Sequence, residues 1–136
     1  MALSKDSPLK NREDRNESFP VKAATTVYEG AICGLDSGYA RGLVAGDQFI
    51  GHCIEQADNS AGAAAAINVE CITGMYKLEV TLASVAITDV GSQAYGSADG
   101  TYTLTPGGNS YVGRVVRYVK ANTCIIEFQT HSEAIS

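Results

Sequence analysis

The sequence contains no tryptophan, only three prolines and only three phenylalanines. It has no apolar run that approaches the roughly 18 to 20 residues of a transmembrane helix, so we expect no membrane partner. The amino terminus reaches Lys5 and Asp6 before a hydrophobic core can form, which predicts that there is no secretory signal. The length of 136 residues fits one domain that can bury a core without metal or disulfide support.

Basic residues are scarce relative to acidic ones. Lysine and arginine together number 10 and aspartate and glutamate 15, which gives a formal net charge of -5. Proteins that bind nucleic acid usually present a basic face, so this balance argues against a nucleic-acid partner. An acidic surface instead favours solubility and discourages non-specific association.

The motifs of common catalytic and cofactor sites are also missing. The chain has no GxSxG, P-loop, HExxH or GxGxxG pattern. His52 and Cys53 are adjacent, and neighbouring residues on a strand point to opposite faces, so they should not form a nucleophile–base pair. We expect His52 to be hydrogen-bonded within the fold or to lie at an edge, and His131 to fall in a poorly ordered terminus. The chain is therefore predicted not to be an enzyme and to hold no cofactor.

The four cysteines are far apart in the sequence and include no CxxC pair. Metal sites usually bring two ligands close together in sequence, so a metal centre is the least favoured interpretation. Buried free thiols are favoured over disulfides, because the absence of a signal peptide indicates a reducing compartment. The residues concerned are Cys33, Cys53, Cys71 and Cys124.

What the sequence does contain is a regular succession of apolar segments and turn residues. Glycine, aspartate, asparagine and proline recur between short stretches in which apolar and polar residues alternate, which is typical of an all-β fold. We predict a jelly-roll-like β-sandwich or short barrel with an extended N-terminal arm. Residues 1–19 are predicted to be the polar arm, residues 20–130 the folded domain and residues 131–136 a C-terminal tail.

Two segments give the most detailed predictions. Residues 75–82 alternate between apolar and polar side chains, which predicts a half-buried strand. In residues 111–119, Arg114 and Arg117 would point to opposite faces of a regular strand, so we predict a bulge near Val115 and Val116. The bulge would leave both arginines outside. Residues 61–66 are predicted to be a loop and residues 83–90 to hold a short helical turn that ends at Gly91.

The order and spacing of several short segments resemble one known family. The chain is similar to the small bacteriophage head decoration proteins, also called capsid cement proteins, over about residues 20–129. The arm of residues 1–19 is not part of this pattern. The segments that carry the resemblance are residues 21–24 (Val-Lys-Ala-Ala), 28–31 (Tyr-Glu-Gly-Ala), 49–53 (Phe-Ile-Gly-His-Cys), 58–62, 89–91, 94–95 and 109–116.

The resemblance implies a structural virion protein on the outer surface of a phage head, assembled in the host cytoplasm. Its partner would be the major capsid protein, whose lattice it stabilises. Self-association is expected on separate grounds, because the edge strands of a small β-domain must be covered, and a dimer is slightly preferred over a trimer. Family members bring no catalytic residues. The capsid-contact candidates come instead from the arm and its junction with the domain, because an extended arm can lie across a neighbouring subunit. These candidates are Lys10, Arg12, Arg15, Phe19 and Val21.

Three alternatives remain open at this point. The protein could be another phage or surface β-module that binds a receptor or a tail component. A small β-barrel hydrolase is the less favoured alternative. The arm could also be a solvated leader without a function of its own.

Overall fold

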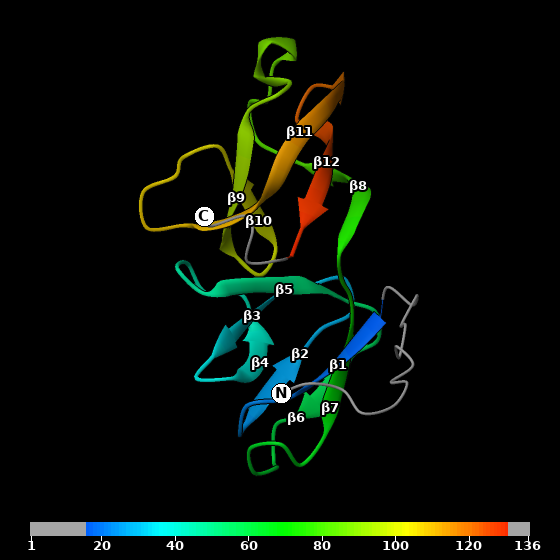
Figure 1. Ribbon diagram of the computed structural model, residues 1–136, viewed down its shortest axis with the longest axis vertical. Helices are drawn as coiled ribbons and strands as arrows, with labels where there is room; N and C mark the ends of the chain where they lie inside the picture. Colours follow the sequence, from blue (N-terminus) through cyan, green and yellow to red (C-terminus); the bar gives the residue numbers. More distant parts are fainter. Residues whose placement is uncertain (1–15, 131–136) are drawn as a thin grey trace, which may run out of the picture.

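The computed structural model describes residues 16–130, which form twelve strands and one short 3-10 helix. Figure 1 shows them as an elongated molecule with two parts, one above the other. The first seven strands are β1 (Asn16–Pro20), β2 (Thr25–Val27), β3 (Ile32–Asp36), β4 (Tyr39–Gly42), β5 (Gln48–Cys53), β6 (Ala57–Asn59) and β7 (Asn68–Ile72). They are followed by β8 (Met75–Thr81), helix η1 (Ile87–Asp89), β9 (Gln93–Ala98), β10 (Thr101–Thr103), β11 (Ser110–Lys120) and β12 (Thr123–Gln129).

The strands form two antiparallel five-stranded sheets and one small two-stranded sheet. The lower sheet has the order β1-β7-β5-β3-β4 and the upper sheet the order β10-β9-β11-β12-β8, while β2 pairs with β6. A turn at Gly74, whose φ is +84°, carries the chain from β7 in the lower sheet to β8 in the upper one. The prediction of an all-β sandwich is confirmed, and neither sheet closes into a barrel.

The upper sheet follows the alternation expected from the sequence. In β8, Tyr76 is buried, Leu78 and Val80 are half-buried, and the intervening Lys77 and Glu79 are exposed. On β11 the pairing with β12 shifts between Val115 and Arg117, so the predicted bulge is present. Both arginines are exposed, while Val112 is buried and Tyr118 packs against the upper core. The loop at residues 61–66 and the turn formed by η1 also match the predictions.

The first strand begins earlier than expected. Residues 16–19 were assigned to the polar arm, but β1 starts at Asn16 and pairs with β7 from Asn16↔Ile72 to Pro20↔Asn68. The strand lies at a sheet edge, where polar side chains can remain in solvent, so its composition resembles that of an arm. Residues 1–15 and the predicted tail at residues 131–136 lie outside the described part of the chain. No helix of the described residues is long and apolar enough to cross a membrane.

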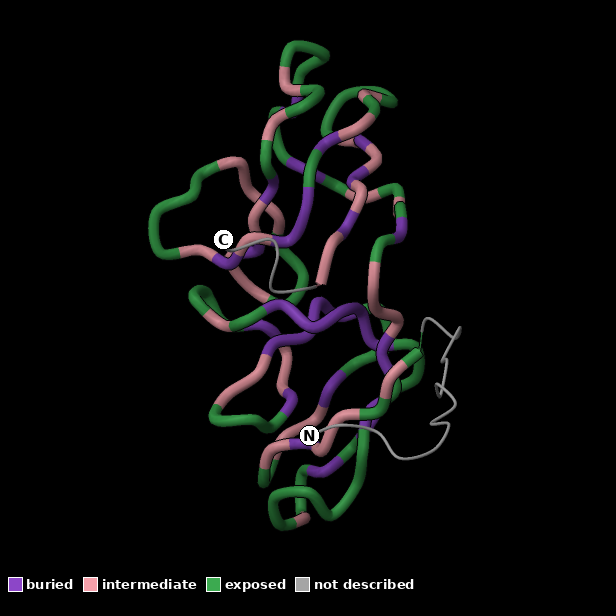
Figure 2. Tube along the Cα trace, viewed as in Figure 1, coloured by how far each residue is buried: buried purple, intermediate pink, exposed green. Residues whose placement is uncertain are grey.

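Each sheet has its own core, and β5 lies between the two. Figure 2 shows β5 at the junction, where it is buried from Phe49 to Cys53. Phe49 and His52 face the upper core, while Ile50 and Cys53 face the lower core. The largest fully buried side chains of the upper core are Phe128, Ile32 and Ile126, and those of the lower core are Val21, Val27 and Val69.

A bulge at Gly51 explains why Phe49 and His52 share a face although they are three residues apart. The pairing of β3 with β5 shifts between Cys33↔Gly51 and Gly34↔Phe49, which inserts one extra residue into β5. Gly51 has a φ of +133°, and a Cβ atom there would lie 2.1 Å from the carbonyl oxygen of Ile72. Only glycine fits this position without strain.

We expect Gly51→Ala to destabilise the protein by about 2–4 kcal/mol, because the added methyl group meets backbone and the φ angle disfavours an L side chain. The change in the free energy of unfolding can be measured by urea denaturation. Gly100→Ala is the matched control, since a Cβ atom there meets nothing within 4 Å. Equal midpoints for the two variants would contradict the role assigned to the bulge.

Candidate functional site

The most concentrated group of polar side chains inside the protein surrounds His52. Its Nδ1 atom lies 2.6 Å from the hydroxyl oxygen of Tyr76, and its Nε2 atom lies 2.7 Å from the hydroxyl oxygen of Tyr102. His52 comes from β5, Tyr76 from β8 and Tyr102 from β10, so the three side chains join the lower sheet to both edges of the upper sheet. The ring of Phe128 packs against all three rings at centroid distances of 4.6 to 5.7 Å.

This arrangement suits a structural clamp better than an acid–base catalyst. Burial lowers the pKa of His52 from 6.5 to about 4, so the imidazole is neutral at physiological pH. Burial also raises the pKa of Tyr76 and of Tyr102. A neutral imidazole can accept a hydrogen bond from one hydroxyl group at its unprotonated nitrogen and donate its own N–H to the other hydroxyl oxygen, so both tyrosines are satisfied. The prediction of a satisfied histidine is confirmed.

The four cysteines lie in the two cores, as the prediction of buried free thiols requires. All four are free and buried. Cys53 and Cys71 lie directly opposite each other on β5 and β7, and a hydrogen bond with Cys71, together with burial, raises the pKa of Cys33. Thiols with raised pKa values are poor nucleophiles at neutral pH. Cys53 faces the lower core while His52 faces the upper one, so the expected separation of the two side chains is confirmed.

Charged side chains on the lower sheet pair with one another. The guanidinium group of Arg41 donates two hydrogen bonds to Asp47, at 3.0 and 2.8 Å, and also lies 3.3 Å from Asp36. Lys22 forms an ion pair with Asp36 and, as the strongest influence, lowers the pKa of that carboxyl group. Among residues 16–130, no group of three or more His, Cys, Asp or Glu side chains has the geometry of a metal site.

One hollow lies near the sequence-predicted contact residue Phe19. It has a volume of about 430 Å³ and is lined by Glu17, Phe19, Leu35, Gln48, Ile50, Thr73 and Thr130. Neither histidine nor cysteine lines it. Phe19 itself is half-buried and packs against the lower core.

The other contact candidates fall into two groups. Val21 is fully buried, and its backbone accepts a hydrogen bond from Ala65, so its side chain belongs to the core rather than to an outer surface. Lys10, Arg12 and Arg15 lie outside the described residues. The structure therefore brings Phe19 and Val21 together in the lower core and places only Phe19 beside a hollow.

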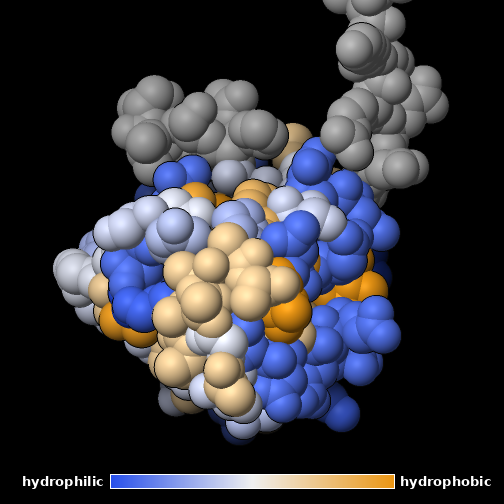
Figure 3. Space-filling view, turned by 90° about the horizontal axis from the view of Figure 1, so that it is seen from below, coloured by the Kyte–Doolittle hydropathy of each residue, from blue (hydrophilic) through white to orange (hydrophobic). Residues whose placement is uncertain are grey.

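The lower end of the molecule presents an alanine-rich surface. The β6–β7 loop exposes Ala61 and residues 63–66, and Figure 3 shows a weakly hydrophobic area on this end. The buried amide of Asn59 holds the loop in place, because its Nδ2 atom donates to the carbonyl oxygens of Lys22 and Ala63, each at 3.0 Å. The amide of Ala65 donates to Val21 at 2.9 Å, so the loop is fixed from two sides.

The upper end exposes larger apolar side chains. Ile87 in η1 is 71% exposed, and Val90 just after it is 44% exposed. Val119, near the end of β11, is 39% exposed. Figure 1 shows η1 and the β11–β12 hairpin together at this end. Neither surface follows from the sequence pattern, because the prediction of a loop or a turn does not say which of its apolar side chains are exposed.

We expect the His52 clamp to make the protein less stable in mild acid. Between pH 6.5 and pH 4 the unfolded chain binds a proton at His52 that the folded protein does not, so the free energy of unfolding falls as the pH falls. The full effect is about 3 kcal/mol, and it is complete near pH 4. Urea denaturation at a series of pH values measures it.

The control for this measurement is His52→Gln, which keeps one donor and one acceptor but does not titrate. Asp36 and Asp58, whose pKa values are lowered, contribute their own acid sensitivity to both proteins. The difference between wild type and variant isolates His52. Parallel stability curves from pH 7 to pH 4 would contradict the predicted protonation.

No protein-family model matches the chain, and no match was found among curated proteins or among solved structures.

Proposed function

We propose that this protein is a structural component of a bacteriophage head, which binds the outer surface of the capsid and stabilises the lattice of the major capsid protein. The observation that carries the proposal is that both ends of an elongated molecule expose apolar side chains, alanines at the lower end and Ile87, Val90 and Val119 at the upper end. A protein with two such ends can contact two neighbouring subunits at once. The resemblance of residues 20–129 to capsid cement proteins supplies the partner.

The internal chemistry of the protein supports a binding role. The described ionisable groups with marked pKa shifts are those of the clamp and the buried thiols, and burial is a cause of each shift. Their hydrogen bonds join strands to one another. A catalytic site instead needs such groups to converge on a space that a substrate can enter. The polar groups of this protein hold the fold together, and the two ends remain available for contacts.

A cement protein gains from having two contacts. When one end binds a capsid subunit, binding of the other end becomes intramolecular, so its effective concentration rises and two modest contacts suffice. A rigid body suits this role, because no motion between the ends weakens the second contact. The clamp at His52 joins the upper and lower sheets by two hydrogen bonds, which opposes motion between the two ends.

Substitutions at the two ends test this proposal. Ala64→Glu at the lower end and Ile87→Glu at the upper end should each weaken binding to phage heads at least roughly tenfold, because each places a charge in an apolar contact. Binding is measured by co-sedimentation with expanded heads that lack the protein. Val44→Glu is the matched control, since Val44 is 48% exposed in the β4–β5 connection.

The outcomes distinguish the proposal from its rivals. Failure of the wild-type protein to co-sediment with heads would contradict the proposal, and binding to purified tails instead would favour the tail module. Wild-type binding that survives both substitutions would mean that the ends are not the contact surfaces. Circular dichroism of each variant confirms that it is folded.

The segment before β1 is a third proposed contact, in addition to the two ends. Residues 1–15 include Lys10, Arg12 and Arg15, which could pair with an acidic capsid surface and steer association. Deletion of residues 2–14 leaves β1 intact, because the strand begins at Asn16. We expect the deletion to lower head occupancy at subsaturating concentration, measured by the same sedimentation. Unchanged occupancy would identify the segment as a leader without a binding role.

A further inference from the structure

The outer edge of the upper sheet is formed by β8. Among the described strands at sheet edges, β8 is the longest, with seven residues, compared with five in β1, four in β4 and three in β10. It pairs with β12 on one side and with no described strand on the other. Its pairing is regular from Met75↔Gln129 to Thr81↔Thr123, without a bulge. A long, regular edge of this kind is a template for another strand.

We propose that this edge binds the β8 strand of a second copy of the protein, antiparallel, with a two-fold axis at Leu78. Leu78 is the middle residue of β8, so this register pairs the strand over its whole length. It joins the two upper sheets into one continuous sheet across the dimer. An interface that uses the same strand from both copies is closed, so association stops at the dimer.

The exposed face of β8 is self-complementary in this register. Lys77 of each copy lies opposite Glu79 of the other, which gives two symmetric pairs of opposite charge. Moving the axis to Lys77 would place lysine opposite lysine, and moving it to Glu79 would place glutamate opposite glutamate. A shift by an odd number of residues would put exposed side chains opposite buried ones. The register that pairs the whole strand is thus also the one that matches the charges.

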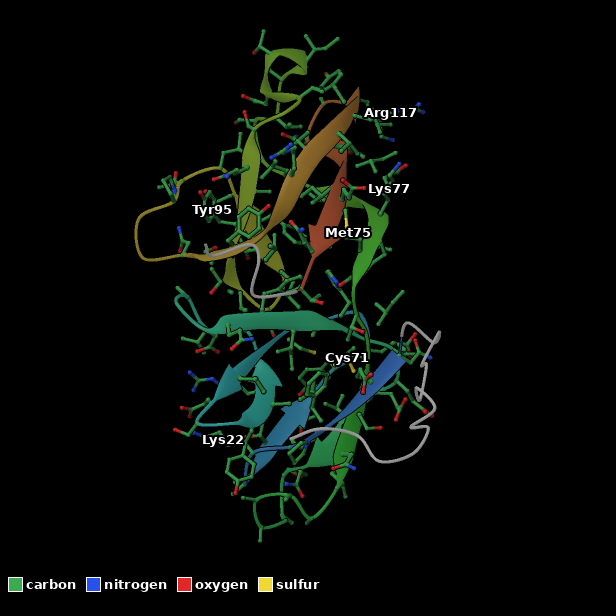
Figure 4. All side chains as sticks on the ribbon, viewed as in Figure 1. Lys22, Cys71, Met75, Lys77, Tyr95 and Arg117 are labelled. Carbon is green, nitrogen blue, oxygen red and sulfur yellow. The ribbon has the colours of Figure 1, made fainter. Side chains whose placement is uncertain are left out.

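The charges on neighbouring strands extend this pattern. Lys77 lies beside Glu127 of β12, which in turn lies beside Arg114 of β11. From β11 to the edge, the charges therefore alternate from Arg114 (positive) to Glu127 (negative) to Lys77 (positive). Glu79 of the second copy continues this alternation. Figure 4 shows Lys77 on the outer side of β8. A second copy thus meets opposite charges at the edge and like charges only two strands away.

The buried face of β8 is complementary as well. Leu78 and Val80 pack against the upper core but remain half-buried at the sheet edge. In the proposed register, Leu78 meets Leu78 of the second copy, and Val80 meets Tyr76. Aromatic and β-branched residues are favourable cross-strand partners. A second copy would therefore cover the apolar surface that β8 leaves half-exposed.

Charge reversal at two exposed positions tests the register. Lys77→Glu and Glu79→Lys should each weaken the dimer roughly tenfold, because each turns two attractive pairs into repulsive ones. The double variant swaps the charges and should recover near wild-type affinity. Sedimentation equilibrium of the full chain over a concentration series at low salt measures the dissociation constant. Lys120→Glu and Glu29→Lys are the matched controls, since both residues are exposed and outside β8.

A cross-linking experiment identifies the strand directly. An equal mixture of ¹⁴N- and ¹⁵N-labelled protein is treated with a carbodiimide, which joins an amine to a carboxylate by an amide bond with loss of water. The proposal expects a Lys77–Glu79 cross-link between peptides of different isotope label. This result does not depend on capsid binding, so it stands or fails separately from the proposed function.

Several results would overturn the inference. A wild-type protein that stays monomeric at roughly 100 μM has no such interface. A trimer would require a different interface. A dimer that the double variant fails to restore has a different register. A monomer that dimerises only after deletion of residues 2–14 would assign the β8 edge to that segment of its own chain. Thermal melts of the single variants show whether any loss reflects unfolding.

Discussion

The fold depends on one strand that serves two cores. β5 is buried along almost its whole length, and its side chains divide between the upper and the lower core. The division works only because the bulge at Ile50 and Gly51 inserts one residue and resets the alternation, so that Phe49 and His52 point the same way. The backbone of β5 pairs with β3 and β7, while its side chains reach β8 and β10. The two parts are therefore connected through packing as well as through the chain.

Burying His52 in this strand would be unfavourable if its ring nitrogens had no hydrogen-bond partners. An imidazole in an apolar core needs partners for both ring nitrogens. Tyr76 and Tyr102 supply them from the two edge strands of the upper sheet, and Phe128 fills the space between the rings. The same contacts that satisfy His52 also fix the position of the upper sheet on β5. Polar satisfaction and the arrangement of the two sheets thus have a common origin.

The parts of the fold that sequence predicts are those where one face of a strand meets solvent. The alternation in residues 75–82 and the bulge between Arg114 and Arg117 are visible because polar side chains mark the exposed face. β5 shows no such alternation, because both of its faces are buried. Its apolar run is compatible with a buried helix as well as with a buried strand. The partners of His52 lie 24 and 50 residues away, and local periodicity carries no signal over that separation. β1 is difficult to predict because its side chains are mostly polar and partly exposed, so that this edge strand has the composition of an unstructured arm.

The candidate surfaces were harder to predict than the fold. Val21 is among the predicted contact residues, but its side chain is fully buried in the lower core. The alanine run was correctly identified as a loop, yet its place at one end of the molecule depends on the hydrogen bonds of Asn59. The charge pattern of β8 was visible in sequence, but its meaning depends on knowing that β8 is an edge.

The alanine loop has a consequence for the thermodynamics of any contact made there. An alanine side chain has no rotamers to lose, whereas a lysine or glutamate loses up to about 2 kcal/mol of conformational entropy when it is immobilised. The backbone of this loop is already held by Asn59 and Val21. A partner that covers this end would order almost nothing that is not ordered beforehand. Its small methyl groups also allow the partner's backbone to come close, so such a contact would gain from dispersion rather than from deep hydrophobic burial.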